Sequence, residues 1–123
     1  MQQIRVSVII PTFNRPLYLA EAVQSILNQT CPATEIIIID NASVAEHNLA
    51  LSRIGNLHPS IHLTRLDSNR GPGHARNAGL MQSRGDWILF MDDDDVLSPD
   101  YIETCQECIR CDEKAEMVIT RAF

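Results

Sequence analysis

The chain has 123 residues, of which 45% are hydrophobic and 21% charged, a composition typical of a single globular domain. Its 10 lysine and arginine residues stand against 16 aspartate and glutamate residues, and this net charge of −6 argues against a protein that binds nucleic acid through its phosphates. The first apolar run, Val6–Ile10, is too short for a transmembrane segment and has no small-residue cleavage site after it. We therefore expect a cytoplasmic protein with reduced cysteines.

Short segments rich in β-branched or aromatic residues alternate with segments of helical period. In chain order, the predicted strands are Ile4–Ile10, Glu35–Asp40, Ile61–Leu66, Asp86–Met91 and Glu116–Thr120. The predicted helices between them are Pro16–Gln29, Val44–Ile54, Gly73–Arg84 and Ser98–Cys111. Pro16 suits a first helical turn, Gly85 a helix stop, and Ser98 with Pro99 a helix start.

This alternation predicts an α/β fold with a doubly wound, mostly parallel sheet in a Rossmann-like, three-layer α/β/α arrangement. We expect the strand order 3-2-1-4, with the fifth strand beyond the fourth. In such a sheet, ligands bind outside the carboxyl ends of the strands. The residues that directly follow each strand are therefore the candidates for function.

Four consecutive aspartates, Asp92–Asp95, follow the fourth predicted strand. Carboxylates at a strand end suit Mg²⁺ or Mn²⁺, which are typically held by one or two carboxylates and by phosphate oxygens of the substrate. In an extended chain, Asp92 and Asp94 would share one side, and Asp93 and Asp95 the other. The alternative is an acidic turn that leads into the next helix, an alternative that is strongest for Asp95.

Four segments, VSVIIPTFNR, IIIIDNAS, NRGPGHARNAGL and WILFMDDDD, resemble in order and spacing the amino-terminal half of the family 2 glycosyltransferases with the GT-A fold. The resemblance covers nearly the whole chain. It implies that residues 1–123 form one nucleotide-sugar-binding domain, the amino-terminal part of a longer GT-A catalytic domain. It also implies inverting transfer of a sugar to a glycan or lipid-linked acceptor, in the cytoplasm or at the inner membrane face, with the catalytic base beyond Phe123.

The resemblance implies roles for two groups of residues around the first and fourth strands. Asp92–Asp94 match the D-x-D element, whose first part lies near the ribose and whose last aspartate holds a divalent ion. Asp94 and Asp92 are therefore the expected metal ligands, and Asp92 and Asp93 also belong to the nucleotide site. The segment along the base and ribose is matched by Pro11, Thr12 and Phe13, and Asn14 and Arg15 complete this part of the site. Packing in the core is the alternative role of Phe13.

Two further pairs match family positions after the second and third strands. Asp40 and Asn41 match the pair that reads the base edge, and Arg76 and Asn77 match a run near the diphosphate, where a guanidinium supplies bidentate bonds. Asn41 replaces the usual second aspartate; it keeps an acceptor oxygen but adds two donors, so the base is left open, with a UDP-sugar or dTDP-sugar preferred. Arg76 has the alternative role of a structural ion-pair partner of the aspartates.

Three alternatives stay open. LFMDDDDVL also resembles the end of a strand in haloacid dehalogenase phosphatases, with Asp92 as nucleophile and Asp94 as general acid. The chain is alternatively a nucleotide-binding fragment without catalytic activity. Cys105, Cys108 and Cys111 have the spacing of an iron–sulfur run, but a helix with Ile102, Cys105 and Ile109 on its buried stripe is favoured.

Overall fold

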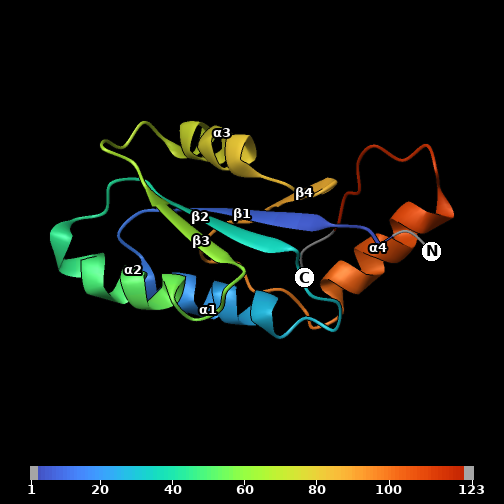
Figure 1. Cartoon of the computed structure of the whole chain (residues 1–123), viewed down its shortest axis with the longest axis horizontal. Coiled ribbons are helices and arrows are strands. Elements are labelled where there is room, and N and C mark those ends of the chain that lie inside the picture. Colours follow the sequence, from blue (N-terminus) through green and yellow to red (C-terminus); the bar gives the residue numbers. More distant parts are fainter. Residues whose placement is uncertain (1–2, 121–123) are drawn as a thin grey trace.

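The computed structural model describes residues 3–120, which form a parallel sheet between two layers of helices (Figure 1). The elements in chain order are β1 (Val6–Thr12), α1 (Pro16–Leu27), β2 (Glu35–Asp40), the 3-10 helix η1 (Ala45–His47), α2 (Asn48–Gly55), β3 (Ile61–Arg65), α3 (Pro72–Gln82), β4 (Trp87–Phe90) and α4 (Tyr101–Cys111). The described residues contain four strands in the order β3-β2-β1-β4, and all neighbours are parallel. The predicted α/β class and the order 3-2-1-4 are confirmed.

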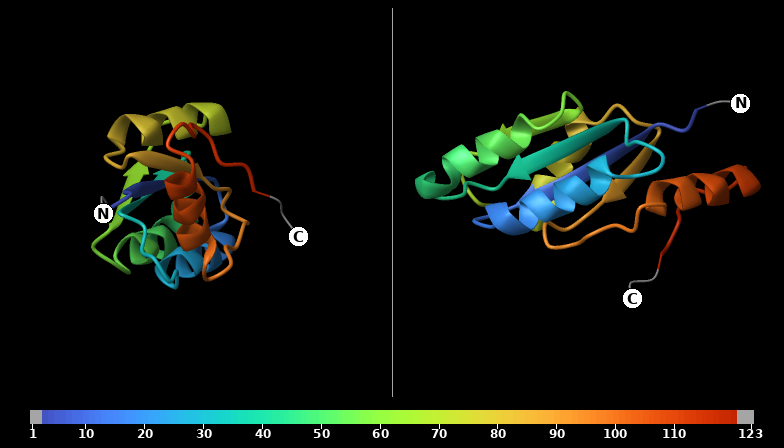
Figure 2. Two further views of the ribbon diagram at one scale, coloured as in Figure 1. Left: turned by 90° about the vertical axis from the view of Figure 1, so that its right-hand side faces the viewer. Right: turned by 90° about the horizontal axis from the view of Figure 1, so that it is seen from below.

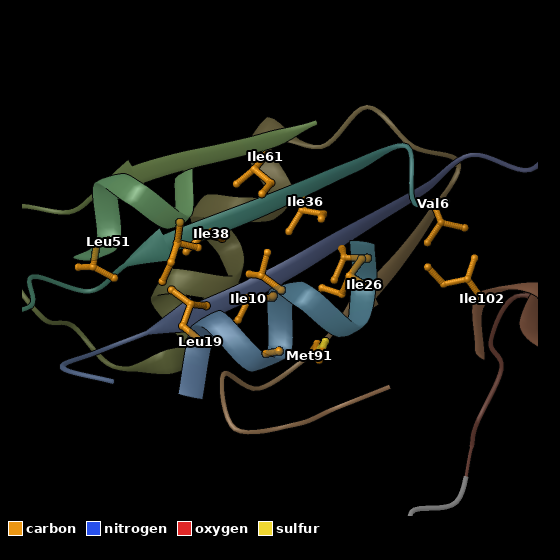
Figure 3. Packing of buried hydrophobic residues seen from close by; sticks show 14 residues of the cluster. Val6, Ile10, Leu19, Ile26, Ile36, Ile38, Leu51, Ile61, Met91 and Ile102 are labelled. Atoms are coloured by element: carbon orange, nitrogen blue, oxygen red, sulfur yellow. The ribbon is translucent and has the colours of Figure 1, made fainter. Parts of the chain in front are cut away.

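The strands β1 and β2 are buried on both faces of the sheet, which is why their sequences are almost continuously apolar. Helices α1 and α2 cover one face and α3 covers the other (Figure 2). On the first face, Ile10 and Ile38 pack against Leu19 and Ile26 of α1 (Figure 3). Each such fully buried side chain stabilises the fold by about 1.5–3 kcal/mol relative to an exposed one.

The second face of the sheet has fewer buried side chains than the first, and a small residue lets α3 approach it. Ile9, Ile37 and Ile39 pack there with Ala75 of α3. A Cβ added to Gly79 would lie 2.5 Å from the Cγ2 atom of Ile9, so that no larger residue fits without a shift. This close contact fixes α3, and with it the residues at the start of α3, against the strand ends.

Two predicted helix ends differ from the structure. The helix α4 begins at Tyr101 instead of Ser98, because Ser98 and Pro99 lie in the preceding turn. The helix α3 ends at Gln82 with Ser83 as its cap, so Gly85 is not its stop. Gly85 instead packs against β1, where its N–H donates a 2.8 Å hydrogen bond to the Oγ atom of Ser7.

Ser7 belongs to a buried polar cluster at the amino end of the sheet. Its hydroxyl donates a 2.7 Å hydrogen bond to Glu35, and the backbone N–H of Arg84 donates to the same carboxylate oxygen at 2.6 Å. Burial acts to raise the pKa of Glu35, but these two hydrogen bonds, together with the charges of His62 and Arg84, outweigh it and lower the pKa. The cluster lies at the opposite end of the strands from the candidate site and is a structural feature.

The predicted fifth strand, Glu116–Thr120, is wrong for the described part of the chain. This segment follows α4 as chain without assigned secondary structure or a strand partner, although the hydroxyls of Tyr101 and Thr120 are 2.7 Å apart. A strand needs a neighbour to accept its backbone hydrogen bonds, and β4 is not hydrogen-bonded to this segment.

The outer part of α4 is less buried than predicted. Ile102 is buried, as expected, but Cys105 and Ile109 are only partly buried, and Gln106 joins the buried face through a hydrogen bond to the carbonyl of Ile4. Among residues 3–120, no helix is long and apolar enough to cross a membrane.

Candidate functional site

A polar cleft of about 480 Å³ opens at the carboxyl ends of β1, β2 and β4 and beside the start of α3. The residues that line it come from four separate segments of the chain: Pro11, Thr12, Phe13, Arg15, Asn41, Asn69, Pro72, Arg76, Asp92, Asp93 and Asp94. A larger groove of about 680 Å³ lies beside β4, but its lining is mainly apolar. The charged groups lie in the smaller cleft, which is therefore the candidate site.

Asp93 forms the floor of this cleft at its contact with β1. Its carboxylate accepts a 2.9 Å hydrogen bond from the hydroxyl of Thr12, and both side chains are buried. Its other oxygen lies 3.5 Å from the guanidinium of Arg15. Burial raises the pKa of Asp93 and the charge of Asp94 adds to this, although Thr12 and Arg15 oppose it. The surroundings of Asp93 therefore disfavour its charged form relative to that of a free aspartate, and Thr12 and Arg15 offset this only in part.

Two arginines, Arg15 and Arg76, contact the aspartates in the cleft. Arg76 of α3 donates a 2.9 Å hydrogen bond to Asp92, and Arg15 lies 3.5 Å from Asp94. The four carboxylates of Asp92–Asp95 and the two guanidinium groups leave two formal negative charges in excess. This excess equals the charge of one divalent cation. Arg76 thus forms the ion pair that was expected as its alternative role, and it also lines the cleft.

Asp92, Asp94 and Asp95 carry oxygen atoms that all lie within 4.8 Å of one another. The predicted alternation of Asp92 and Asp94 against Asp93 and Asp95 is wrong, because the chain turns here instead of staying extended. The N–H of Asp95 bonds to the carbonyl of Asp92 at 3.2 Å, which brings Asp95 to the same side as Asp92. Three exposed carboxylates form an oxygen donor set that suits Mg²⁺ or Mn²⁺.

Asp40 does not line the cleft. Its side chain is fully buried and accepts hydrogen bonds from the Nε atom of Arg65 at 2.8 Å and from the backbone N–H of Ser43 at 3.0 Å. The register of β2 and β3 places Asp40 directly beside Arg65. Asp40 therefore supports the loop after β2, and Asn41 is the member of the pair that reaches the cleft.

Asn41 has a fixed amide orientation. Its Nδ2 atom donates a 3.1 Å hydrogen bond to the carbonyl of Gly71, whereas its Oδ1 atom is enclosed and has no partner among the described residues. Only 4% of Asn41 is exposed. An unpaired buried acceptor costs about 1–3 kcal/mol unless a ligand satisfies it. Gly71 has a φ of +89°, a conformation that favours glycine, and it directly precedes α3.

The loop after β1 is held by side chain to backbone bonds. Asn14, with a φ of 55°, accepts a hydrogen bond from the N–H of Val44, and its own N–H donates to Ser43. Asn14 thus joins two loops but is not part of the cleft lining, and the exposed Asn77 is not part of it either. Phe13 is 42% exposed at the cleft, so the alternative of core packing for Phe13 is wrong.

Asn69 and Pro72 were not predicted as site residues, although they line the cleft. The available signal was their place in the loop after a predicted strand. Arg65 was also missed, because its role depends on the strand register beside Asp40. The remaining predicted residues, Pro11, Thr12, Phe13, Arg15, Asn41, Arg76, Asp92, Asp93 and Asp94, come together in one cleft.

Comparison with known proteins gives one consistent family. A sequence model of the family described as Glycosyl transferase family 2 matches residues 7–121. The succinoglycan biosynthesis protein ExoO of Rhizobium meliloti is 35% identical over 95 residues, a match that covers 77% of this chain and 27% of that protein. The chain spans 27% to 39% of the length of the first curated relatives.

Two of the similar solved structures illustrate the likeness in fold. Staphylococcus aureus TarS in complex with UDP has a TM-score of 0.77 and 29% sequence identity, covering 87% of this chain and 32% of that chain. The mannosyltransferase PcManGT of Pyrobaculum calidifontis, in complex with GDP-Man and Mn²⁺, has a TM-score of 0.80 and 26% identity, covering 89% of this chain and 33% of that chain.

Proposed function

This chain belongs to glycosyl transferase family 2, and on that basis we propose that its cleft binds a nucleoside diphosphate sugar as the donor half of an inverting glycosyltransferase. The observation that carries the proposal is the cleft itself, in which Asp92, Asp93 and Asp94 meet Arg15 and Arg76. Carboxylates for a cation and guanidinium groups for phosphate are both needed to hold a diphosphate.

The contacts suggest different roles for the buried and the exposed aspartates. Asp93 is buried against Thr12, whereas Asp94 and Asp92 are exposed, contact Arg15 and Arg76 respectively, and are the proposed metal ligands. A divalent ion, Mn²⁺ or Mg²⁺, would supply a Lewis acid for the charge that develops on the departing diphosphate. Arg76 would then exchange part of its contact with Asp92 for the phosphate oxygens.

The base would lie against Pro11 and Phe13, near Asn41. Because Gly71 holds the Nδ2 atom of Asn41, the oxygen is the group left to accept a hydrogen bond, as a carboxylate would. This acceptor favours the imide N–H of uracil or thymine, so a UDP-sugar or dTDP-sugar is the proposed donor. The oxygen is enclosed, and contact with a base therefore requires a small local displacement around Asn41.

We propose a glycan or lipid-linked acceptor, since the related ExoO is described as a succinoglycan biosynthesis protein. The inverting course and the cytoplasmic location remain predictions. The phosphatase alternative is set aside, because the glycosyl transferase family 2 match spans residues 7–121. The alternative of a nucleotide-binding unit without transfer activity remains open.

Titration of the ¹⁵N-labelled chain with UDP and Mg²⁺, followed by NMR, tests the proposal. We expect the largest shifts at the amides of Thr12, Phe13, Asn41 and Arg76. Matched titrations with GDP and ADP should show weaker binding if Asn41 selects a pyrimidine. Shifts confined to Cys105 and Ile119 in the groove beside β4, or no shifts at all, would contradict binding in the cleft.

A further inference from the structure

The segment between the aspartates and α4 is bound along its length by two polar side chains at the carboxyl end of α1. The backbone N–H of Leu97 donates a 3.1 Å hydrogen bond to the Oγ atom of Ser25, and the carbonyl of Ser98 accepts a 2.6 Å bond from the Nε2 atom of Gln29. The Oε1 atom of Gln29 accepts a 2.9 Å bond from the N–H of Ile102 in α4. Figure 2 shows this segment (orange) passing beside α1 (blue) on its way to α4.

The two side chains are oriented by further bonds of their own. The hydroxyl of Ser25 donates its proton to the carbonyl of Ala22 at 2.7 Å, so its oxygen is left to accept the N–H of Leu97. Gln29 is only 8% exposed, and its Nε2 atom also donates to the carbonyl of Ser25 at 3.1 Å. Serine is not favoured inside a helix, and a buried glutamine has to satisfy both ends of its amide. What the two residues share is the bond to the segment after the aspartates.

This segment determines where the aspartate turn, Asp92–Asp95, ends. On the upstream side, the buried bond from Thr12 to Asp93 holds the turn against β1. On the downstream side, Leu97 is, among residues 3–120, the first residue after Asp93 whose backbone bonds to a different element of the fold. The two exposed aspartates that follow Asp93 therefore lie between two closely spaced anchors, one on β1 and one on α1.

Helix α1 is a rigid support for the downstream anchor. Its side chains Leu19 and Ile26 are fully buried against the sheet (Figure 3). Arg15, which directly precedes α1, lies 3.5 Å from the carboxylate of Asp94. The same helix thus carries a charge partner of the aspartates near its start and binds the chain after them near its end.

We propose that Ser25 and Gln29 are positioning residues of the metal site. They contact neither the ion nor the nucleotide, and they act through the backbone that follows the aspartate turn, by holding Asp94 where it can reach the ion. This inference rests on the proposed function, in which Asp94 and Asp92 bind the metal. Mg²⁺ and Mn²⁺ require oxygen ligands at defined positions, so a loosened turn should bind the ion more weakly even in a folded protein.

Three substitutions separate positioning from general stability. Ser25→Ala removes the acceptor of the Leu97 N–H, whereas Ser25→Thr keeps a hydroxyl at the same place. Thr30→Ala is the matched control on the same side of the segment. It removes a 2.7 Å side-chain bond to Glu103 but keeps the backbone bond from Thr30 to the carbonyl of Pro99.

The measurement is a titration with Mn²⁺ alone, followed by the paramagnetic broadening of the amide signals of Asp92–Asp95. Thermal melts verify that each variant is folded at the temperature used. The dissociation constant for Mn²⁺ should rise roughly threefold to tenfold in Ser25→Ala and should stay near the wild-type value in Ser25→Thr and Thr30→Ala. Gln29→Glu, which replaces the donor to Ser98 by an acceptor, should raise the constant at least as much as Ser25→Ala does.

An unchanged constant in Ser25→Ala would overturn the proposal, and so would an equal rise in Thr30→Ala, which would trace the effect to general stability. Titration of the same samples with UDP separates this inference from the proposed function. If the wild-type protein does not bind UDP but Ser25→Ala still weakens Mn²⁺ binding, the nucleotide site is wrong and the positioning role stands. If UDP binds with Mn²⁺ and Ser25→Ala leaves the Mn²⁺ affinity unchanged, only the positioning role is wrong. Broadening that is absent from Asp92–Asp95 in the wild type would overturn the metal site and the positioning role together.

Discussion

Thr12 and Asp93 are joined by a buried hydrogen bond of 2.9 Å, although 81 residues separate them in the sequence. Thr12 is the last residue of β1, and Asp93 lies in the turn that follows β4, the neighbour of β1 in the sheet. The bond ties the aspartate turn to the sheet and directs Asp93 inward. As a result, Asp92 and Asp94 face outward, where a cation can reach them.

Asp93→Asn should stabilise the protein at neutral pH. The folded-state pKa of Asp93 lies above the ordinary value of 3.8, so between these two values the folded state binds more protons than the unfolded state. The contribution of Asp93 to stability is therefore fully present below pH 3.8 and is lost as the pH rises through the raised pKa. In urea unfolding from pH 3 to pH 7, the free energy of unfolding of the mutant should exceed that of the wild type by an amount that grows with pH. A difference that stays constant with pH would argue against a raised pKa.

Asp94→Asn should change ligand affinity and stability in opposite directions. Loss of one of four adjacent charges relieves repulsion, so the fold should be unchanged or slightly more stable, but the proposed metal ligand is lost. Wild-type protein at a ligand concentration 100 times the Kd should gain about 2.7 kcal/mol from Mn²⁺ with UDP, and the mutant should gain almost none. Thermal melts with and without these ligands measure both effects. A mutant that melts lower alone and keeps the full ligand-induced rise would make Asp94 a structural residue.

Gly79→Ala should destabilise the domain by about 1–3 kcal/mol, because its Cβ would lie 2.5 Å from a side-chain carbon of Ile9 in a packed layer. Gly73→Ala is the matched control in the same helix, since nothing lies within 4 Å of its added Cβ. The control should be unchanged or slightly stabilised, by less than about 1 kcal/mol, because Gly73 lies in the first turn of α3 and not in its interior. Equal effects of the two substitutions in chemical denaturation would mean that α3 is not held closely against β1.

Asn41→Asp should lower the free energy of unfolding by about 1–3 kcal/mol, because a carboxylate oxygen would replace the donor that now bonds to the carbonyl of Gly71. Asn41→Ala separates the lost bond from the added repulsion and should be the less damaging change. Urea unfolding of both variants at pH 7 provides the measurement. A stable Asn41→Asp protein would show that the bond to Gly71 does not fix the orientation of the amide.

The fold was largely predictable because its information is local. Buried parallel strands leave β-branched runs such as Glu35–Asp40, and polar residues after each strand mark the carboxyl edge where they meet. That topology brings together in one cleft the side chains of Thr12, Arg15, Arg76 and the aspartates.

Other features depend on contacts that a single segment does not contain. Asp40 is bound to Arg65 through the register of β2 with β3, and the orientation of Asn41 depends on where Gly71 lies. The turn that brings Asp95 beside Asp92 is likewise set by backbone bonding that the repeated aspartates do not specify. The segment Glu116–Thr120 has the composition of a strand, but a strand also requires a neighbour.

Calorimetric titration of the chain with UDP, in Mn²⁺ and again with excess chelator, tests the account most directly. The four aspartates and two arginines leave an excess of two negative charges, which should repel a diphosphate unless a divalent ion offsets it. We predict measurable binding in Mn²⁺ that weakens at least about tenfold, or about 1.4 kcal/mol, when the ion is removed. Equal affinity under the two conditions would contradict the metal role of Asp94 and Asp92, and no binding under either would contradict the nucleotide site itself.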